Sequence, residues 1–225
     1  MQKEVLIIIP AYNEEKNISK VLDRLEQPEI AEFADILVMN DASSDNTNWI
    51  VKARHHAVVT HVFNLGYGSA LQLGYKYAIR CNYRYVIQMD ADGQHDAGNL
   101  INLYRALKTP DENGVYPDIV LGSRYLNDSP YFETSALKRF AFFLFRHIIK
   151  WSTGRTIMDP TTGLQGLSRR AALCYSKFGN FDEKYPDANM ITNMLLSDFN
   201  IVEIPAAMHL REHGKSMHSG LKPIG

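Results

Sequence analysis

Short apolar segments rich in β-branched residues alternate along this chain with segments of helical periodicity. This alternation is typical of βαβ units, in which helices join parallel strands and pack on the sheet. The predicted strands lie near Val5–Pro10, Asp35–Asn40, Val58–Phe63, Tyr85–Met89 and Asp118–Gly122. The predicted helices lie near Glu14–Glu26, Asp45–His55, Ser69–Arg80 and Ala97–Leu107. We therefore predict an α/β protein with a mostly parallel central sheet flanked by helices.

Length and composition limit the domain count and the partners. The 225 residues, 45% hydrophobic and 22% charged, suffice for one large α/β core but not for two. We predict a single domain over residues 1–225, regular over about 1–126 and irregular over about 127–225. A formal net charge of −1 gives no general attraction to nucleic acid, which we exclude as a partner. Cys81 and Cys174 suit reduced thiols in a cytoplasmic protein, although a disulfide stays open.

Polar residues follow every predicted strand. The segments are "AYNEE", "DASSDNT", "NLGYGS", "DADGQ" and "SRY". Ligands of open parallel sheets bind at the carboxyl ends of the strands, so we expect these segments to meet in one site.

Two carboxylates stand at the end of the fourth predicted strand. Asp90 and Asp92 are two residues apart, and alternate residues of a strand point to the same face. Carboxylate oxygens are hard ligands that suit Mg²⁺ or Mn²⁺ and leave positions for phosphate oxygens of a substrate. Gln94 or His95 adds a neutral ligand or a hydrogen bond that supports the aspartates. We predict a metal site at Asp90, Asp92 and Gln94; the alternative is an ordinary turn, because Asp and Gly are common after strands.

Gly66 and Gly68 lead into a predicted helix. A glycine-rich helix N-terminus permits close approach of a phosphate or a sugar. Leu71 occupies the position where a dinucleotide-binding fingerprint needs a small residue, so that fingerprint is absent.

The longest apolar run covers residues 140–151 and contains Arg146 and His147. It is shorter than the roughly 20 apolar residues that cross a bilayer as a helix. Two interpretations stay open: a buried helix, or an interfacial helix whose apolar side meets a membrane surface while its cations face the lipid headgroups.

Seven motifs occur in a fixed order between Val5 and about Ser219: "IPAYNEE", "NDASSDNT", "NLGYGSALQLGY", "DADGQ", "GSRY", "DPTTGLQGLSR" and "REHGKS". In order and spacing they resemble glycosyltransferase family 2, in particular the branch similar to dolichyl-phosphate mannose synthase and polyprenyl-phosphate glycosyltransferases. The resemblance implies a GT-A fold, a nucleotide-diphosphate-sugar donor, Mn²⁺ or Mg²⁺ as cofactor, and inversion at the anomeric carbon.

The resemblance also implies roles for individual residues. The implied donor-binding residues are Pro10, Tyr12, Glu14, Asp41, Asn64, Gly68, Asp90, Arg211, Lys215 and Ser216. The implied metal ligands are Asp90, Asp92 and Gln94, and the implied catalytic residues are Asp92, Arg124 and Asp187. Arg124 would hold an acceptor phosphate. Asp187 falls at the acidic position of the acceptor side, where Pro186 and Asp187 replace the usual Glu-Asp pair.

We expect a metal-dependent inverting hexosyltransferase acting on a dolichyl or undecaprenyl phosphate. One alternative is transfer to a sugar hydroxyl in polysaccharide or cell-wall glycan synthesis, with Asp187 as the base. Another is a non-catalytic nucleotide-sugar-binding subunit. The expected place is the cytoplasmic face of a membrane, held peripherally or by a small membrane partner protein. UDP and GDP both stay open as the donor nucleotide.

Overall fold

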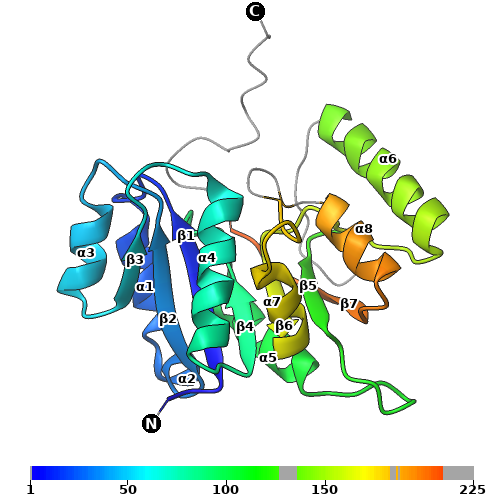
Figure 1. The fold of residues 1–225 in the computed structure, drawn as a ribbon, viewed down its shortest axis with the longest axis horizontal. Helices are drawn as coiled ribbons and strands as arrows, with labels where there is room; N and C mark the ends of the chain where they lie inside the picture. Colours follow the sequence, from blue (N-terminus) through cyan, green and yellow to red (C-terminus); the bar gives the residue numbers. More distant parts are fainter. Residues whose placement is uncertain (1, 127–135, 183–185, 187, 210–225) are drawn as a thin grey trace, which may run out of the picture.

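The computed structural model describes residues 2–126, 136–182, 186 and 188–209. One seven-stranded sheet has the order β3-β2-β1-β4-β6-β5-β7 and carries helices on both faces (Figure 1). The strands are β1 Val5–Ala11, β2 Ala34–Asn40, β3 Ala57–Thr60, β4 Tyr85–Gln88, β5 Ile119–Ser123, β6 Gln165–Ser168 and β7 Ile201–Pro205. The helices are α1 Ile18–Leu25, α2 Pro28–Ala31, α3 Thr47–Ala53, α4 Tyr67–Arg80, α5 Ala97–Leu107, α6 Ala136–Thr153, α7 Arg169–Ser176 and α8 Ala188–Leu196. The predicted α/β class is confirmed.

Strand β1 forms the centre of the sheet. It pairs in parallel with β2 and β4, and all seven of its residues are buried. Leu6 and Ile8 face the core under α4 and α7, whereas Ile7 and Ile9 face the core under α1 and α5. A strand covered on both faces needs an uninterrupted apolar run, which the segment "VLIII" supplies.

The second half of the chain extends the same sheet. Strand β6 runs antiparallel to β4 and β5, and β7 runs parallel to β5. All strands except β6 therefore point the same way, and their carboxyl ends lie at one edge. The region predicted as irregular contributes two strands and three helices to the described structure. The proposed boundary near residue 126 stays a prediction.

Two predicted boundaries are wrong by three residues or more. Strand β3 ends at Thr60, paired with Asn40, and Val62 and Phe63 beyond it are exposed. Helix α1 begins at Ile18 and not at Glu14, because the loop before it is bonded to the loop after β2.

Helix α6 packs beside α8, at the opposite end of the molecule from α3 (Figure 1). Of its side chains described from residue 143 on, Ile149 is buried at 1% exposure. Leu144, Ile148 and Trp151 are exposed and share one face, since they are spaced four and three residues apart. The buried-helix interpretation is therefore wrong for this part of α6. Within the described residues, no helix is both long and apolar enough to cross a membrane.

We predict that Gly74→Ala destabilises the protein. A Cβ at this position of α4 would lie 2.7 Å from Cγ2 of Ile8 in β1, so either the helix or the Ile8 side chain must shift. The expected loss is about 1–3 kcal/mol in the free energy of unfolding, measured by urea denaturation. A gain of about 1 kcal/mol, the helix-propensity effect of an unhindered Gly→Ala change, would show that the contact is not tight.

Candidate active site

Asp90 and Asp92 follow β4 at the carboxyl edge of the sheet. Oδ1 of Asp90 accepts a hydrogen bond from the hydroxyl of Tyr67 at 2.9 Å. Oδ2 lies 3.6 Å from Nε2 of His95. A Cβ at position 163 would lie 2.5 Å from Oδ2, so only a glycine allows this carboxylate its position. Asp90 is thus enclosed by three separate segments of the chain.

Asp92 and Gln94 form a tight turn after Asp90. Asp92 is 8% exposed, and its Oδ1 accepts the backbone N–H of Gln94 at 3.1 Å. The Gln94 side-chain amide donates to the carbonyl of His209, and the His209 N–H donates to the carbonyl of Gln94 at 2.7 Å. The turn with the two aspartates therefore holds the chain just before the "REHGKS" motif.

Asp90 and Asp92 supply carboxylate oxygens, the ligand type that Mg²⁺ and Mn²⁺ bind together with oxygens of a substrate. Among the described residues, no group of three or more His, Cys, Asp or Glu side chains could hold a metal alone. Mg²⁺ usually keeps several waters and binds one or two carboxylates plus phosphate oxygens, so two carboxylates suffice when a diphosphate is bound. The amide nitrogen of Gln94 donates to His209, so Oε1 of Gln94 is the atom that would join them.

The surroundings of Asp90 favour its ionised form. Burial alone would raise its pKa, but the nearby His95 ring, the hydrogen bond from Tyr67 and the charge of Arg124 together hold the pKa below its usual value. A carboxylate that stays ionised is ready to bind a cation.

Asp41 organises the glycine-containing loop before α4. Its Oδ1 accepts from Nδ1 of His61 at 2.7 Å and from the N–H of Leu65 at 2.9 Å, and its Oδ2 accepts from the N–H of Gly66 at 2.8 Å. Asp41 is 4% exposed. In this structure the carboxylate predicted to bind the base is engaged by the loop, so the base-binding role stays a prediction.

The loop after β1 and the loop after β2 are tied together by reciprocal bonds. The N–H of Glu14 donates to Oγ1 of Thr47 at 2.8 Å, and the N–H of Glu15 donates to Oδ2 of Asp45 at 3.0 Å. Asp45 also accepts the N–H of Thr47, the first residue of α3, although the N-cap position itself is held by Asn46. Tyr12 beside this joint is 51% exposed. The two loops present a fixed surface rather than two independent strand ends.

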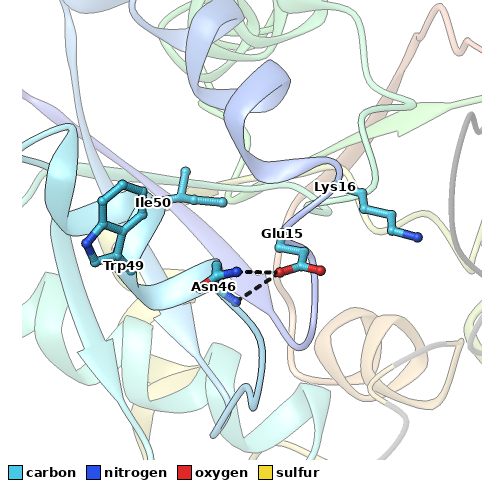
Figure 2. A pocket seen from close by; sticks show the side chains of 5 residues that line it. All are labelled: Glu15, Lys16, Asn46, Trp49 and Ile50. Carbon is cyan, nitrogen blue, oxygen red and sulfur yellow. Dashed lines mark hydrogen bonds between the residues drawn. The ribbon is translucent and has the colours of Figure 1, made fainter.

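A shallow pocket of about 600 Å³ lies beside this joint, lined by Glu15, Lys16, Asn46, Trp49 and Ile50. Figure 2 shows the Glu15 carboxylate bonded twice by Asn46, with Trp49 and Lys16 on opposite sides of the pair. Glu15 is occupied in bracing the loops. The pocket shares no residue with the aspartate turn.

The remaining donor-side residues lie at the same edge of the sheet. Pro10 is in β1 and buried, and Gly68 is buried in the first turn of α4. Asn64 is exposed in the loop before α4. Their roles toward a nucleotide-sugar stay predictions.

Arg124, directly after β5, is held by a buried carboxylate. Nε and Nη2 of Arg124 donate to the two carboxylate oxygens of Asp159, both at 2.7 Å, and its backbone N–H donates to Oδ2 at 2.9 Å. Asp159 is fully buried. Glu203 of β7 in turn accepts the N–H groups of Met158 and Asp159 at 2.7 and 2.8 Å. A chain of polar contacts thus runs from β7 to the residue predicted to hold the acceptor phosphate.

Four predicted site residues, Asp187, Arg211, Lys215 and Ser216, lie outside the described residues. Two residues that bond to the predicted site residues or to their partners were not predicted from the sequence. Tyr67 stands inside the motif "NLGYGS" but was assigned no role, and Glu203 lies in a strand that was not predicted. The only sequence signal for Tyr67 was its position between two glycines.

Residues 6–175 match the sequence model of the family described as Glycosyl transferase family 2. The chain is 30% identical over 169 residues to an uncharacterised protein of Methanocaldococcus jannaschii, covering 75% of this chain and 66% of that protein. It is 26% identical over 186 residues to the UDP-N-acetylglucosamine–dolichyl-phosphate N-acetylglucosaminyltransferase of Methanococcus voltae, covering 75% and 71%. The aligned segment thus spans about two thirds of each relative.

The fold is similar to that of glucosyl-3-phosphoglycerate synthase from Mycobacterium tuberculosis, solved with Mn²⁺, UDP and glucosyl-3-phosphoglycerate. The TM-score is 0.68 at 15% identity, covering 95% of this chain and 73% of that one. The match and the shared GT-A architecture define a class of sugar-transferring enzymes. This chain belongs to glycosyl transferase family 2, as its motifs predicted.

We predict that Asp159→Asn destabilises the protein by about 3 kcal/mol, because it removes the charge that compensates a largely buried Arg124. Urea denaturation measures the loss. Arg84→Gln is the control: its ion pair with Glu4 is exposed, and its loss is expected to cost less than about 1 kcal/mol. Equal effects of the two variants would mean that the buried pair does not hold the site together.

Proposed function

We propose that this protein transfers a hexose from a nucleotide-diphosphate-sugar to a polyprenyl phosphate, in an inverting reaction that depends on Mn²⁺ or Mg²⁺. The observation that carries the proposal is the pair Asp90 and Asp92 at the carboxyl end of β4, beside the glycine loop that starts α4, in a family 2 chain. The Methanococcus voltae relative is named for a UDP-sugar donor and a dolichyl-phosphate acceptor, which supports this substrate class.

The chemistry follows from where negative charge develops. Breaking the bond between the sugar and the diphosphate places charge on the leaving oxygen, and a divalent cation held there supplies a Lewis acid. Asp90 and Asp92 would hold that ion. The N–H groups at the start of α4 lie at the positive end of the helix dipole, which favours an anionic donor. An acceptor phosphate is ionised near neutral pH and therefore needs cations, not a base.

Arg124 is our candidate for that cation. Asp159 already holds the guanidinium group of Arg124, so the orientation of this group is set before any substrate binds. A phosphate bound at Arg124 would either join the ion pair of Arg124 with Asp159 or compete with Asp159 for the guanidinium group. In either case Arg124→Ala is expected to weaken acceptor use while nucleotide binding is kept.

Helix α6 supports a lipid acceptor. Its exposed face carries Leu144, Ile148 and Trp151, of which Trp151 is 90% exposed. Lys150 is exposed next to this face. An amphipathic helix with Trp on its apolar side and cations beside it binds at the surface of an anionic bilayer. We propose that α6 docks the enzyme peripherally on the membrane that contains its acceptor.

We predict that Asp92→Ala lowers sugar transfer at least about a hundredfold, because the cation loses one of two protein ligands. Transfer of radiolabelled sugar from UDP- or GDP-sugars to a polyprenyl phosphate measures the effect. Thermal-shift titration with UDP and GDP, with and without Mn²⁺, identifies the nucleotide.

The control is Glu29→Ala, which removes an exposed carboxylate of α2 and is expected to keep full activity. A chelator should abolish transfer by the wild type, and Mn²⁺ should restore it. Full activity of the Asp92 variant in chelator would refute the metal role. Transfer to a glycan hydroxyl with no transfer to lipid phosphate would refute the acceptor class.

We predict that Leu144→Glu combined with Trp151→Glu weakens binding to vesicles containing anionic lipid at least about tenfold, since two apolar side chains can no longer enter the bilayer. Vesicle co-sedimentation measures the loss. Phe178→Glu is the control, because Phe178 is 88% exposed outside α6. Equal losses in both proteins, or none in the double variant, would mean that α6 is not the docking helix.

A further inference from the structure

The two oxygens of Asp90 lie in different surroundings. Oδ1 accepts the hydroxyl of Tyr67 at 2.9 Å. Oδ2 faces the backbone at Gly163, where any side chain would collide with it, and Nε2 of His95 at 3.6 Å. The Nε2 distance is beyond hydrogen-bond range, so within the described residues the direct side-chain hydrogen bond to this carboxylate comes from Tyr67.

The backbone next to Tyr67 is itself held by Asp41, the residue after β2. Asp41 accepts hydrogen bonds from the N–H groups of Leu65 and Gly66, the two residues before Tyr67. Gly66 has φ of 98°, a conformation that residues with a Cβ rarely adopt, and it sets the turn from which α4 begins. Tyr67 is the first residue of α4, so its hydroxyl reaches Asp90 from a constrained backbone.

The path of hydrogen bonds from Asp41 to Tyr67 and on to Asp90 crosses three neighbouring strands of the sheet. Asp41 follows β2 and Asp90 follows β4, and β1 separates these two strands. The path therefore joins the glycine loop, on the donor side of the site, to a carboxylate of the aspartate turn.

We infer that Tyr67 is a positioning residue that orients the Asp90 carboxylate for a divalent cation and couples this orientation to the glycine loop. This inference rests on the proposed metal-dependent function. A hydrogen bond to one oxygen of a metal-binding carboxylate fixes its rotation and leaves lone pairs on both oxygens for other contacts. Losing such a partner typically weakens metal binding 10- to 100-fold.

The test is Tyr67→Phe, which keeps the ring and removes only the hydroxyl. Electron paramagnetic resonance of free Mn²⁺ measures the Mn²⁺ affinity of the protein saturated with UDP or GDP, whichever stabilises the wild type. We expect the variant to bind Mn²⁺ about tenfold more weakly than the wild type. Nucleotide affinity without metal, measured by calorimetry, should change less than twofold.

Tyr104→Phe is the matched control. Its hydroxyl also donates to a carboxylate, Oε2 of Glu4 at 2.6 Å, but Glu4 precedes β1 at the other end of the strands. This variant should bind Mn²⁺ like the wild type, and both variants should melt within a few degrees of it. Equal Mn²⁺ affinity in Tyr67→Phe and the wild type would overturn the inference, as would equal weakening in both variants. Absence of Mn²⁺ binding by the wild type would instead overturn the proposed metal role, and the inference with it.

Discussion

Burial of β1 on both faces is the constraint on which the rest of this structure depends. All seven residues of the strand are covered, by α4 and α7 on one side and by α1 and α5 on the other. Polar chemistry cannot be placed along such a strand without a large desolvation cost. It can be placed only where the strands end. Because β6 alone runs against the others, six strand ends meet at one edge, and the polar loops gather there.

The loops at this edge are joined to one another by hydrogen bonds. Glu14 and Glu15 bond to the loop after β2, Asp41 holds the loop before α4, and Asp159 holds Arg124 after β5. Mutually bonded loops hold their polar groups in fixed directions, and such preorganisation is a main source of catalytic stabilisation where charge develops. The carboxylate of Asp41 and the guanidinium of Arg124 are already bonded within the protein, so a substrate must share or exchange these bonds. The price is a set of buried carboxylates that each need several donors.

Much of this architecture was visible in the sequence. The alternation of apolar and amphipathic segments predicted the five strands of the first 126 residues and four of their five helices, missing only the short α2, and the order of the motifs predicted the family. The second half was predicted poorly. Strand β6 has only four residues, "QGLS", and its assignment depends on pairing with β4 and β5, which no local pattern reveals. Helix α6 was recognised as apolar, but its sequence did not determine whether it is buried.

The sequence alone determined the class of fold, the family and the position of the two aspartates, because these depend on local periodicity and on residue types at fixed spacing. Only the tertiary structure decided which donors each carboxylate receives. Asp41 bonds to residues 24 and 25 positions away, Asp90 to a tyrosine 23 positions away, and Arg124 to an aspartate 35 positions away. Such contacts join loops that the sheet brings together, and the order of strands in the sheet, not the spacing along the chain, sets which loops become neighbours.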